Sequence, residues 1–257
     1  MPLQLNKLSD EFIQRRIRTL KQYQEELLPA PPQTDDAVKL EDYYDNTGEN
    51  ACAIGLMTYQ LEGDVEEIRK QLRQAGELLY QLHAVRQPPQ AGEFRIPWLF
   101  LKTLALLGCF PGKVALTGLA GFEQWRYYGQ EEHPEAAQLV RYLGILKAYL
   151  AGAALDDRTA LSIQDQTTLD NASKYERKFL LPQVKALRSV EQRHEAGLQA
   201  ALRELVKSHQ TEATKGELAK KPEGLVCLPG LLLAKLGRDR GLAAGVESPY
   251  LPVKLLE

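Results

Sequence analysis

The chain has few of the side chains on which disulfide-stabilised folds and many enzyme sites depend. Its 257 residues include only three cysteines and four histidines. The cysteines, Cys52, Cys109 and Cys227, are far apart and odd in number, which is a poor framework for disulfides. Each belongs to or follows an apolar stretch, where a free cysteine behaves as a small hydrophobic residue. This pattern favours a reducing compartment, and we expect a cytoplasmic protein.

The histidines do not indicate nucleophilic catalysis, which requires a serine or cysteine close to a histidine and an orienting carboxylate. None of His83, His133, His194 and His209 lies near a glycine-framed serine or cysteine. His83 and His209 fall in the last turns of predicted helices, where a cation suits the helix dipole. We therefore predict no catalytic residue and no enzyme activity.

Metal and nucleotide sites are equally poorly supported. Glu191 and His194 have the i, i+3 spacing of ferritin-like dinuclear sites, but such sites need the motif twice, and the sequence contains no second Glu-x-x-His. Gly118, Gly121 and Gly129 follow no predicted strand, so no phosphate-binding loop is indicated. We predict neither a metal nor another cofactor. A ferritin-like metal enzyme is the least favoured alternative.

Charge and hydropathy argue against nucleic acid and membrane as partners. The net charge is −2, whereas proteins that coat nucleic acid normally carry a basic excess. The basic cluster at positions 15–21 shares its predicted helix with Glu11, Glu25 and Glu26, which is typical of a solvated face. The most apolar stretch, 96–107, contains Lys102 and falls short of the ~20 residues that span a bilayer. The first residues also lack the apolar region of a signal peptide.

Helical periodicity is present along nearly the whole chain. The clearest amphipathic helix covers 65–82, with Asp64 and Glu67 placed as in a capping box. No alternating run of strand length stands out. We therefore predict an all-α fold, an irregular array of roughly eight to eleven antiparallel helices without a sheet of consequence. We expect one domain over residues 1–257, with N-terminal helices and an acidic loop in 1–86 and a helical body in 93–257.

Several boundaries follow from proline, glycine and acidic residues. Pro97 should open a central, mostly apolar helix, because the first helical turn tolerates proline. We predict further helices over about 49–61, 114–125, 134–150 and 225–240, the last interrupted by Pro229 and Gly230, and two or three charged helices over about 167–214. Gly241 suits the position after a helix C-terminus. The tail 247–257 is rich in proline and apolar residues, and we expect it to pack on the body.

Two segments combine acidic and aromatic residues. Positions 35–45 contain five carboxylates and two tyrosines, and 125–132 read WRYYGQEE. Tyrosine and tryptophan are favoured interface anchors, and carboxylates steer a basic partner into register. A solvated loop and a helix end are equally good readings of these segments. The candidate partner-binding residues are Asp35, Asp36, Glu41, Asp42, Tyr43, Tyr44, Asp45, Trp125, Tyr127, Tyr128, Glu131 and Glu132.

The C-terminal third carries a resemblance to a known family. The helix GLVCLPGLLLAKLGRDRGL ends at Arg240 and Gly241 and is followed by a tail with Ser248, Pro249, Tyr250, Leu251 and Pro252. The preceding helix, LQAALRELVKSHQ, ends near His209. These segments resemble immunity protein family forty-nine, an all-α group from bacterial polymorphic-toxin systems. The resemblance covers the second half of the chain, and residues 1–86 carry no comparable motif.

This resemblance implies an antitoxin-like function in the bacterial cytoplasm. Such a protein would bind a cognate toxin one to one and so neutralise it. The toxin is expected to be a nuclease effector used in interbacterial competition, delivered by a system such as type VI secretion and basic at its contact surface. A non-catalytic helical scaffold or an adaptor or chaperone remains the alternative. Neither the sequence nor the resemblance indicates an oligomeric state.

Overall fold

The computed structural model describes residues 9–26, 30–90, 95–113, 116–129, 136–168 and 172–257. Every regular element formed by these residues is helical, which confirms the all-α prediction. The α-helices are α1 (Asp10–Glu26), α2 (Ala37–Gln60), α3 (Val65–Val85), α4 (Pro97–Cys109), α5 (Trp125–Tyr128), α6 (Ala137–Leu150), α7 (Asp157–Thr168), α8 (Leu181–Glu191), α9 (Glu195–Lys215) and α10 (Leu228–Asp239). Shorter 3₁₀ or π turns are η1 (Leu116–Gly121), η3 (Glu176–Leu180), η4 (Glu217–Lys220), η5 (Pro222–Leu225) and η6 (Val253–Leu256).

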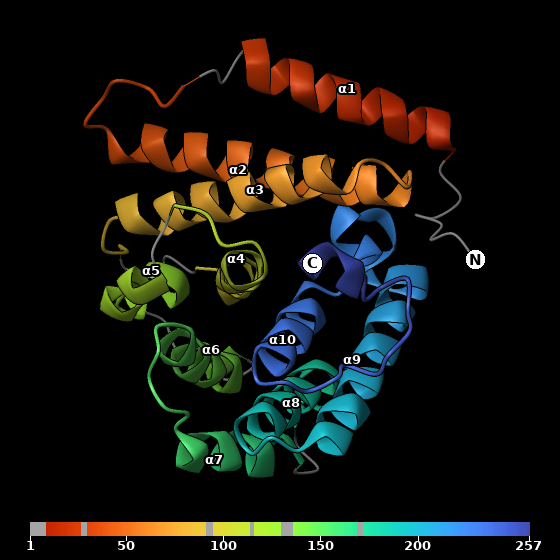
Figure 1. Ribbon diagram of the computed structural model, residues 1–257. Coiled ribbons are helices and arrows are strands. Elements are labelled where there is room, and N and C mark those ends of the chain that lie inside the picture. The colour runs from red at the N-terminus through yellow and green to blue at the C-terminus, as the bar shows by residue number, and fades with distance from the viewer. Residues whose placement is uncertain (1–8, 27–29, 91–94, 114–115, 130–135, 169–171) are drawn as a thin grey trace.

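Helices α1, α2 and α3 form one layer of the molecule; α4 packs on α3 beneath this layer and contacts α6 and α10, while η5 contacts α2 directly (Figure 1). Helix α2 packs along α3 over most of its length. Two glycines of α2 permit this close approach: a Cβ on Gly48 would lie 2.8 Å from Cδ2 of Leu79, and one on Gly55 would lie 2.9 Å from Cδ2 of Leu72. Glycine here serves packing between helices.

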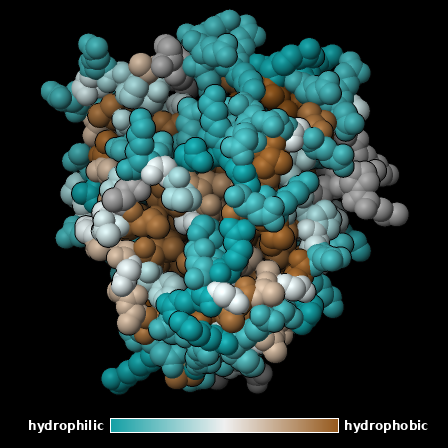
Figure 2. All heavy atoms as spheres, viewed as in Figure 1, coloured by the Kyte–Doolittle hydropathy of each residue, from teal (hydrophilic) through white to brown (hydrophobic). Residues whose placement is uncertain are grey.

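Helix α4 lies at the centre of the fold, as its apolar sequence predicts. It contacts α3, α6 and α10, and Phe100, Leu104 and Leu106 are fully buried. Pro97 occupies the first turn, where its missing N–H leaves no hydrogen bond unmade. The face of the molecule seen in Figure 2 is mainly hydrophilic, with hydrophobic residues exposed in separate patches.

Capping residues are present at several helix ends, including the predicted Asp64 and Gly241. The backbone N–H of Phe12 donates to Ser9 Oγ at 3.3 Å, and that of Glu67 donates to Asp64 Oδ2 at 2.9 Å. Gly241 has a φ of 79°, the left-handed conformation that suits a glycine after a helix C-terminus. Within the described ranges, no helix has the length and apolar character needed to cross a membrane.

Other boundaries differ from the prediction. Helix α2 begins at Ala37, so residues 41–45 are helical and do not form a loop. The predicted helix over 114–125 is replaced by η1 and the short α5, while Val114 lies outside the described residues. Pro229 lies in the first turn of α10 and therefore begins that helix without interrupting it. Helix α7 was not predicted: Asp156 caps it, with Thr159 N–H donating to Asp156 Oδ1 at 3.0 Å.

The C-terminal tail packs against the start of α10 and against α3. Tyr250, Leu251 and Leu255 are buried, and the N–H of Cys227 donates to the carbonyl of Tyr250 at 2.8 Å. Arg69 on α3 donates from Nε to the carbonyl of Leu255 at 3.0 Å. The tail therefore contacts both α10 and the N-terminal layer of helices.

Candidate partner-binding surface

The first acidic segment begins at the N-terminus of α2. Asp36 caps this helix, accepting from the backbone N–H of Val38 at 3.1 Å and that of Lys39 at 3.4 Å. The hydrogen bond from Lys39 is the main cause that holds the pKa of Asp36 below its ordinary value. Asp35, Asp36 and Asp42 are exposed, and the Asp36 carboxylate also lies 3.5 Å from Lys39 Nζ.

The tyrosines of this segment are less accessible than their sequence context indicates. Tyr43 is buried, and burial raises its pKa. Its ring meets that of Tyr44 edge-on at a centroid distance of 5.3 Å. Because residues 41–45 form a helix, one side of the segment must face the core, and Tyr43 is on that side. The prediction of Tyr43 as an exposed anchor therefore needs correction, whereas Tyr44 and Asp45 are half-buried.

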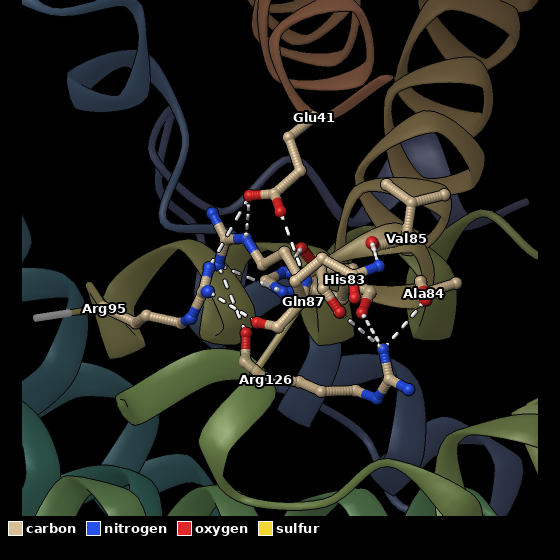
Figure 3. Close-up of polar contacts among 9 residues, drawn as sticks. Glu41, His83, Ala84, Val85, Gln87, Arg95 and Arg126 are labelled. Atoms are coloured by element: carbon tan, nitrogen blue, oxygen red, sulfur yellow. Dashed lines mark hydrogen bonds and ion pairs between the residues drawn. The ribbon is translucent and has the colours of Figure 1, made fainter. Parts of the chain in front are cut away.

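Glu41 also turns inward and joins α2 to two arginines (Figure 3). Its Oε2 lies 3.6 Å from Nε of Arg86 and 3.6 Å from Nη1 of Arg95. Its Oε1 accepts from the backbone N–H of Gln87 at 3.3 Å. Arg95 in turn donates from Nη2 to the carbonyl of Gln87 at 2.8 Å. Glu41 thus fixes the chain that leaves α3 and the residues that lead into α4.

Arg126 of the second segment holds the C-terminal end of α3. Its Nη1 donates to the carbonyls of His83, Ala84 and Arg86 at 3.1, 2.8 and 3.2 Å (Figure 3). The last carbonyls of a helix have no partner within the helix, so a guanidinium placed here satisfies them and suits the helix dipole. The guanidinium carbon also lies 4.4 Å from the ring centroid of Trp125. Arg86 donates from Nη1 to the carbonyl of Arg126 at 3.3 Å.

The remaining aromatic residues of the second segment belong to the core. Tyr127 stacks on Phe100 with ring centroids 4.1 Å apart and planes at 4°, and burial raises the pKa of Tyr127 to about 12. Tyr128 is buried as well. Neither is the exposed anchor that the sequence predicted, because α5 packs on α3 and α4 and both rings are buried. Trp125 is half-buried, and Glu131 and Glu132 lie outside the described residues.

His83 lies beneath these contacts as a neutral structural residue. It is fully buried, and this burial, together with Arg86, places its pKa well below the ordinary value. Thr103 Oγ1 donates to the carbonyl of Leu99 at 2.8 Å, so it can only accept from His83 Nε2 at 3.2 Å. The proton of the imidazole is therefore on Nε2.

The structure brings together the two segments that the sequence singled out separately. Both lie against the C-terminal end of α3, where Arg86 contacts Glu41 from one segment and the backbone of Arg126 from the other. The three arginines were not among the predicted site residues. Of the three, only Arg126 had a signal in the sequence, because it lies next to the predicted site residue Trp125 in the motif WRYY.

Two exposed apolar residues beside this cluster were also missed. Ile96 is 56% exposed and Trp98 is 38% exposed, although both belong to the stretch expected to be central. Ile96 directly precedes α4 and Trp98 lies in its first turn, where the helix reaches the surface. The Trp98 ring packs against Tyr175 with centroids 3.9 Å apart.

The Glu191–His194 pair does not form the ferritin-like arrangement. Helix α8 ends at Glu191, α9 begins at Glu195, and Arg193 between them has a φ of 52°. The two side chains therefore do not share one helical face. Glu191 Oε2 instead contacts Arg240 Nη2 at 2.9 Å and accepts from Tyr149 Oη at 3.1 Å. The described residues contain no group of three or more metal-ligating side chains.

Comparison with known proteins gives one match. The family model described as Immunity protein 49 matches residues 119–255, more than half of the chain. The chain belongs to the Immunity protein 49 family. No curated protein matches, and no solved structure does.

The segments that carried the family resemblance meet in the structure of this immunity protein. His209 on α9 donates from Nε2 to the carbonyl of Gly224 at 3.1 Å, and its ring lies edge-on to Tyr250 of the tail at 5.5 Å. Trp125 and Arg126 fall within the matched residues, whereas Glu41 and Asp42 precede them. The surface around the arginine cluster therefore combines a family segment with residues outside the family match.

Proposed function

We propose that this immunity protein binds a cognate bacterial toxin one to one and neutralises it without chemistry of its own. Membership of the Immunity protein 49 family is the observation that carries this proposal. The contact geometry is consistent with it: ion pairs and carbonyl contacts fix three helices and leave carboxylates on the outside. A rigid scaffold with a charged surface is what stoichiometric inhibition requires.

We further propose that the toxin is a nuclease effector of an interbacterial secretion system, such as type VI, and that inhibition takes place in the bacterial cytoplasm. A nuclease must attract a polyanion, so its substrate cleft is basic. The exposed carboxylates of Asp35, Asp36 and Asp42 suit such a surface. Glu131 and Glu132, which lie outside the described residues, stay predicted partner-binding residues.

The test is protection of cells from the toxin encoded by the gene next to this one. Cells that express that toxin are expected to grow when they also express the wild-type chain and to die when they carry an empty vector. Purified wild-type protein is expected to form a one-to-one complex with a catalytically inactive form of the toxin, measured by light scattering. Equal killing in both strains, together with no complex, would refute the proposed function.

The contribution of the carboxylates can be tested separately. Charge reversal at Asp42 and Asp45 is expected to slow association with the toxin, and to do so more at low salt than at moderate salt, because screening already weakens the attraction. Asp165→Lys on α7 is the matched control, since Asp165 is also an exposed helical aspartate. An association rate equal to that of the control would place the electrostatic contact elsewhere.

A further inference from the structure

Three of the large exposed hydrophobic side chains belong to residues close in the chain to Glu41 or Arg95, which form an ion pair. Val38, one helical turn before Glu41, is 68% exposed; Ile96 and Trp98, which follow Arg95, are 56% and 38% exposed. Isolated exposed hydrophobic residues are ordinary on protein surfaces, but a group of them beside charged residues is a feature of interaction sites.

The chain that carries Ile96 and Trp98 is held at both ends. Arg95 is tied to Glu41 on α2, and Lys102 Nζ donates to Oε2 of Glu49, also on α2, at 2.6 Å. The first turn of α4 therefore cannot move away from α2 without breaking one of two ion pairs. An apolar surface fixed in this way loses little conformational freedom when a partner binds, which favours affinity.

Trp98 is itself supported from a third direction. Its ring plane makes an angle of 73° with that of Tyr175, and the two ring centroids are 3.9 Å apart. Tyr175 in turn stacks on Phe179 with centroids 5.3 Å apart. This support orients the indole while more than a third of the residue stays exposed. A tryptophan that is oriented but exposed has the character of an interface anchor, because it offers a large contact area at a small entropic cost.

The charge on this part of α2 comes from Lys39, which pairs with Asp36 at 3.5 Å, and from two carboxylates further along the helix. Asp42 is exposed and Asp45 is half-buried, one turn apart on α2. The ion pairs of the described residues include neither of them, whereas Glu41 and Glu49 on the same helix are each paired. The surface thus offers apolar contact area together with negative charge, and its complement is an apolar side chain flanked by lysine or arginine.

We infer that Val38, Asp42, Asp45, Ile96 and Trp98, here called the Trp98 surface, form the centre of the toxin contact. Its occupant is a toxin surface that packs an apolar side chain against Ile96 and Trp98 and directs basic groups toward Asp42 and Asp45. This inference rests on the proposed function and deepens it, because it names the contact surface and the chemistry of the partner. In protein interfaces a central tryptophan commonly supplies binding affinity, and carboxylates at the rim attract and orient a basic partner.

The experiment compares single variants for binding to the inactive form of the toxin from the neighbouring gene. Trp98→Ala is expected to weaken affinity by at least about 30-fold, the scale of an interface hot spot. Ile96→Ser, at a more exposed position, is expected to weaken it by about 10-fold. Leu161→Ser on α7 is the matched control, because Leu161 has the same 38% exposure as Trp98. Its affinity is expected to equal that of the wild type.

Ile96→Ser also guards against loss of folding, since replacing an exposed side chain leaves the packing of Trp98 on Tyr175 intact. Circular dichroism melting of each variant completes this check. If the wild type binds and protects but Ile96→Ser and a folded Trp98→Ala bind as tightly as Leu161→Ser, the inference is overturned and the proposed function stands. If the wild type neither binds nor protects, both fail. A wild-type dimer that Trp98→Ala dissociates would assign the surface to a second copy and also overturn the inference.

Discussion

Lys102 on α4 donates from Nζ to Oε2 of Glu49 on α2 at 2.6 Å. It also reaches Oε1 of Glu223 on η5 at 3.1 Å, so one ammonium joins three elements. Burial opposes the charge of Lys102, but the carboxylates hold its pKa above the ordinary value. The lysine that interrupts the apolar stretch 96–107 is therefore a largely buried cation with two half-buried partners.

Replacing this cation is expected to destabilise the fold strongly. In Lys102→Met two half-buried carboxylates lose their shared partner, so we expect a loss of about 2 kcal/mol in the free energy of unfolding, less than for fully buried charges. The measurement is urea denaturation at pH 7. Lys185→Met is the control, because Lys185 pairs with Glu204 at 3.6 Å where both side chains are exposed. It is expected to change stability by less than about 0.5 kcal/mol, and similar losses in both variants would contradict the assignment.

The contrast between α4 and Lys102 shows what the sequence could reveal about the fold. Periodicity and Pro97 were enough to place a central helix, because apolar spacing and the first-turn preference of proline act locally. The partners of Lys102 are 53 and 121 residues away, and no local pattern identifies them. The same limit applies to 116–128, where η1 packs on α6 and α5 packs on α3 and α4, in place of the single helix that the periodicity predicts.

Glu41 provides a second test of the internal contacts. Glu41→Gln removes the charge that faces Arg86 and Arg95, both of which are at most 12% exposed at the side chain. We expect the free energy of unfolding to fall by about 2 kcal/mol, less than for a fully buried pair because Glu41 retains some exposure. Asp42→Asn is the neighbouring control at an exposed position, with an expected change within about 0.5 kcal/mol. Thermal melting that ranks the two variants equally would contradict the role of Glu41.

The sequence predicted which segments contribute to the candidate surface, but not which of their side chains are exposed. The sequence identified two acidic and aromatic segments, and both lie against the end of α3. It could not show that Glu41 and Tyr43 face inward, since the inner side of α2 is fixed by its packing on α3. It also gave no sign that Trp98 is exposed, because a tryptophan in an apolar stretch has the pattern of a core residue.

The C-terminal tail offers a third prediction. Truncation after Gly245 removes Tyr250, Leu251, Leu255 and Leu256 from the core, each of which contributes roughly 1.5–3 kcal/mol by burial. Part of this gain is offset by the ordering of the tail, so we expect a net loss of about 4 kcal/mol and a clearly lower melting temperature. Deletion of Glu257 alone, an exposed residue, is the control and is expected to leave the melting temperature unchanged. An unshifted melting curve for the longer truncation would show that the tail contributes nothing.

His209 predicts how stability depends on pH. Burial lowers its pKa from 6.5 to about 4 in the folded protein. As the pH falls below 6.5, His209 becomes protonated in the unfolded chain but stays neutral in the folded protein. Protonation therefore favours the unfolded chain, and the free energy of unfolding, unaffected above pH 6.5, decreases as the pH approaches 4. At about 1.4 kcal/mol for each pH unit, this loss amounts to roughly 3 kcal/mol.

The measurement is the free energy of unfolding of the wild type and two histidine variants between pH 7 and 4. His209→Gln is expected to have a flatter profile than the wild type, because glutamine does not titrate and its amide can still donate to Gly224. The buried His83, whose pKa is also lowered, continues to supply part of the slope. His194→Gln is the control, since His194 is exposed and its replacement should leave the whole slope in place. Equal slopes in the two variants would mean that His209 does not contribute to the pH dependence of the free energy of unfolding.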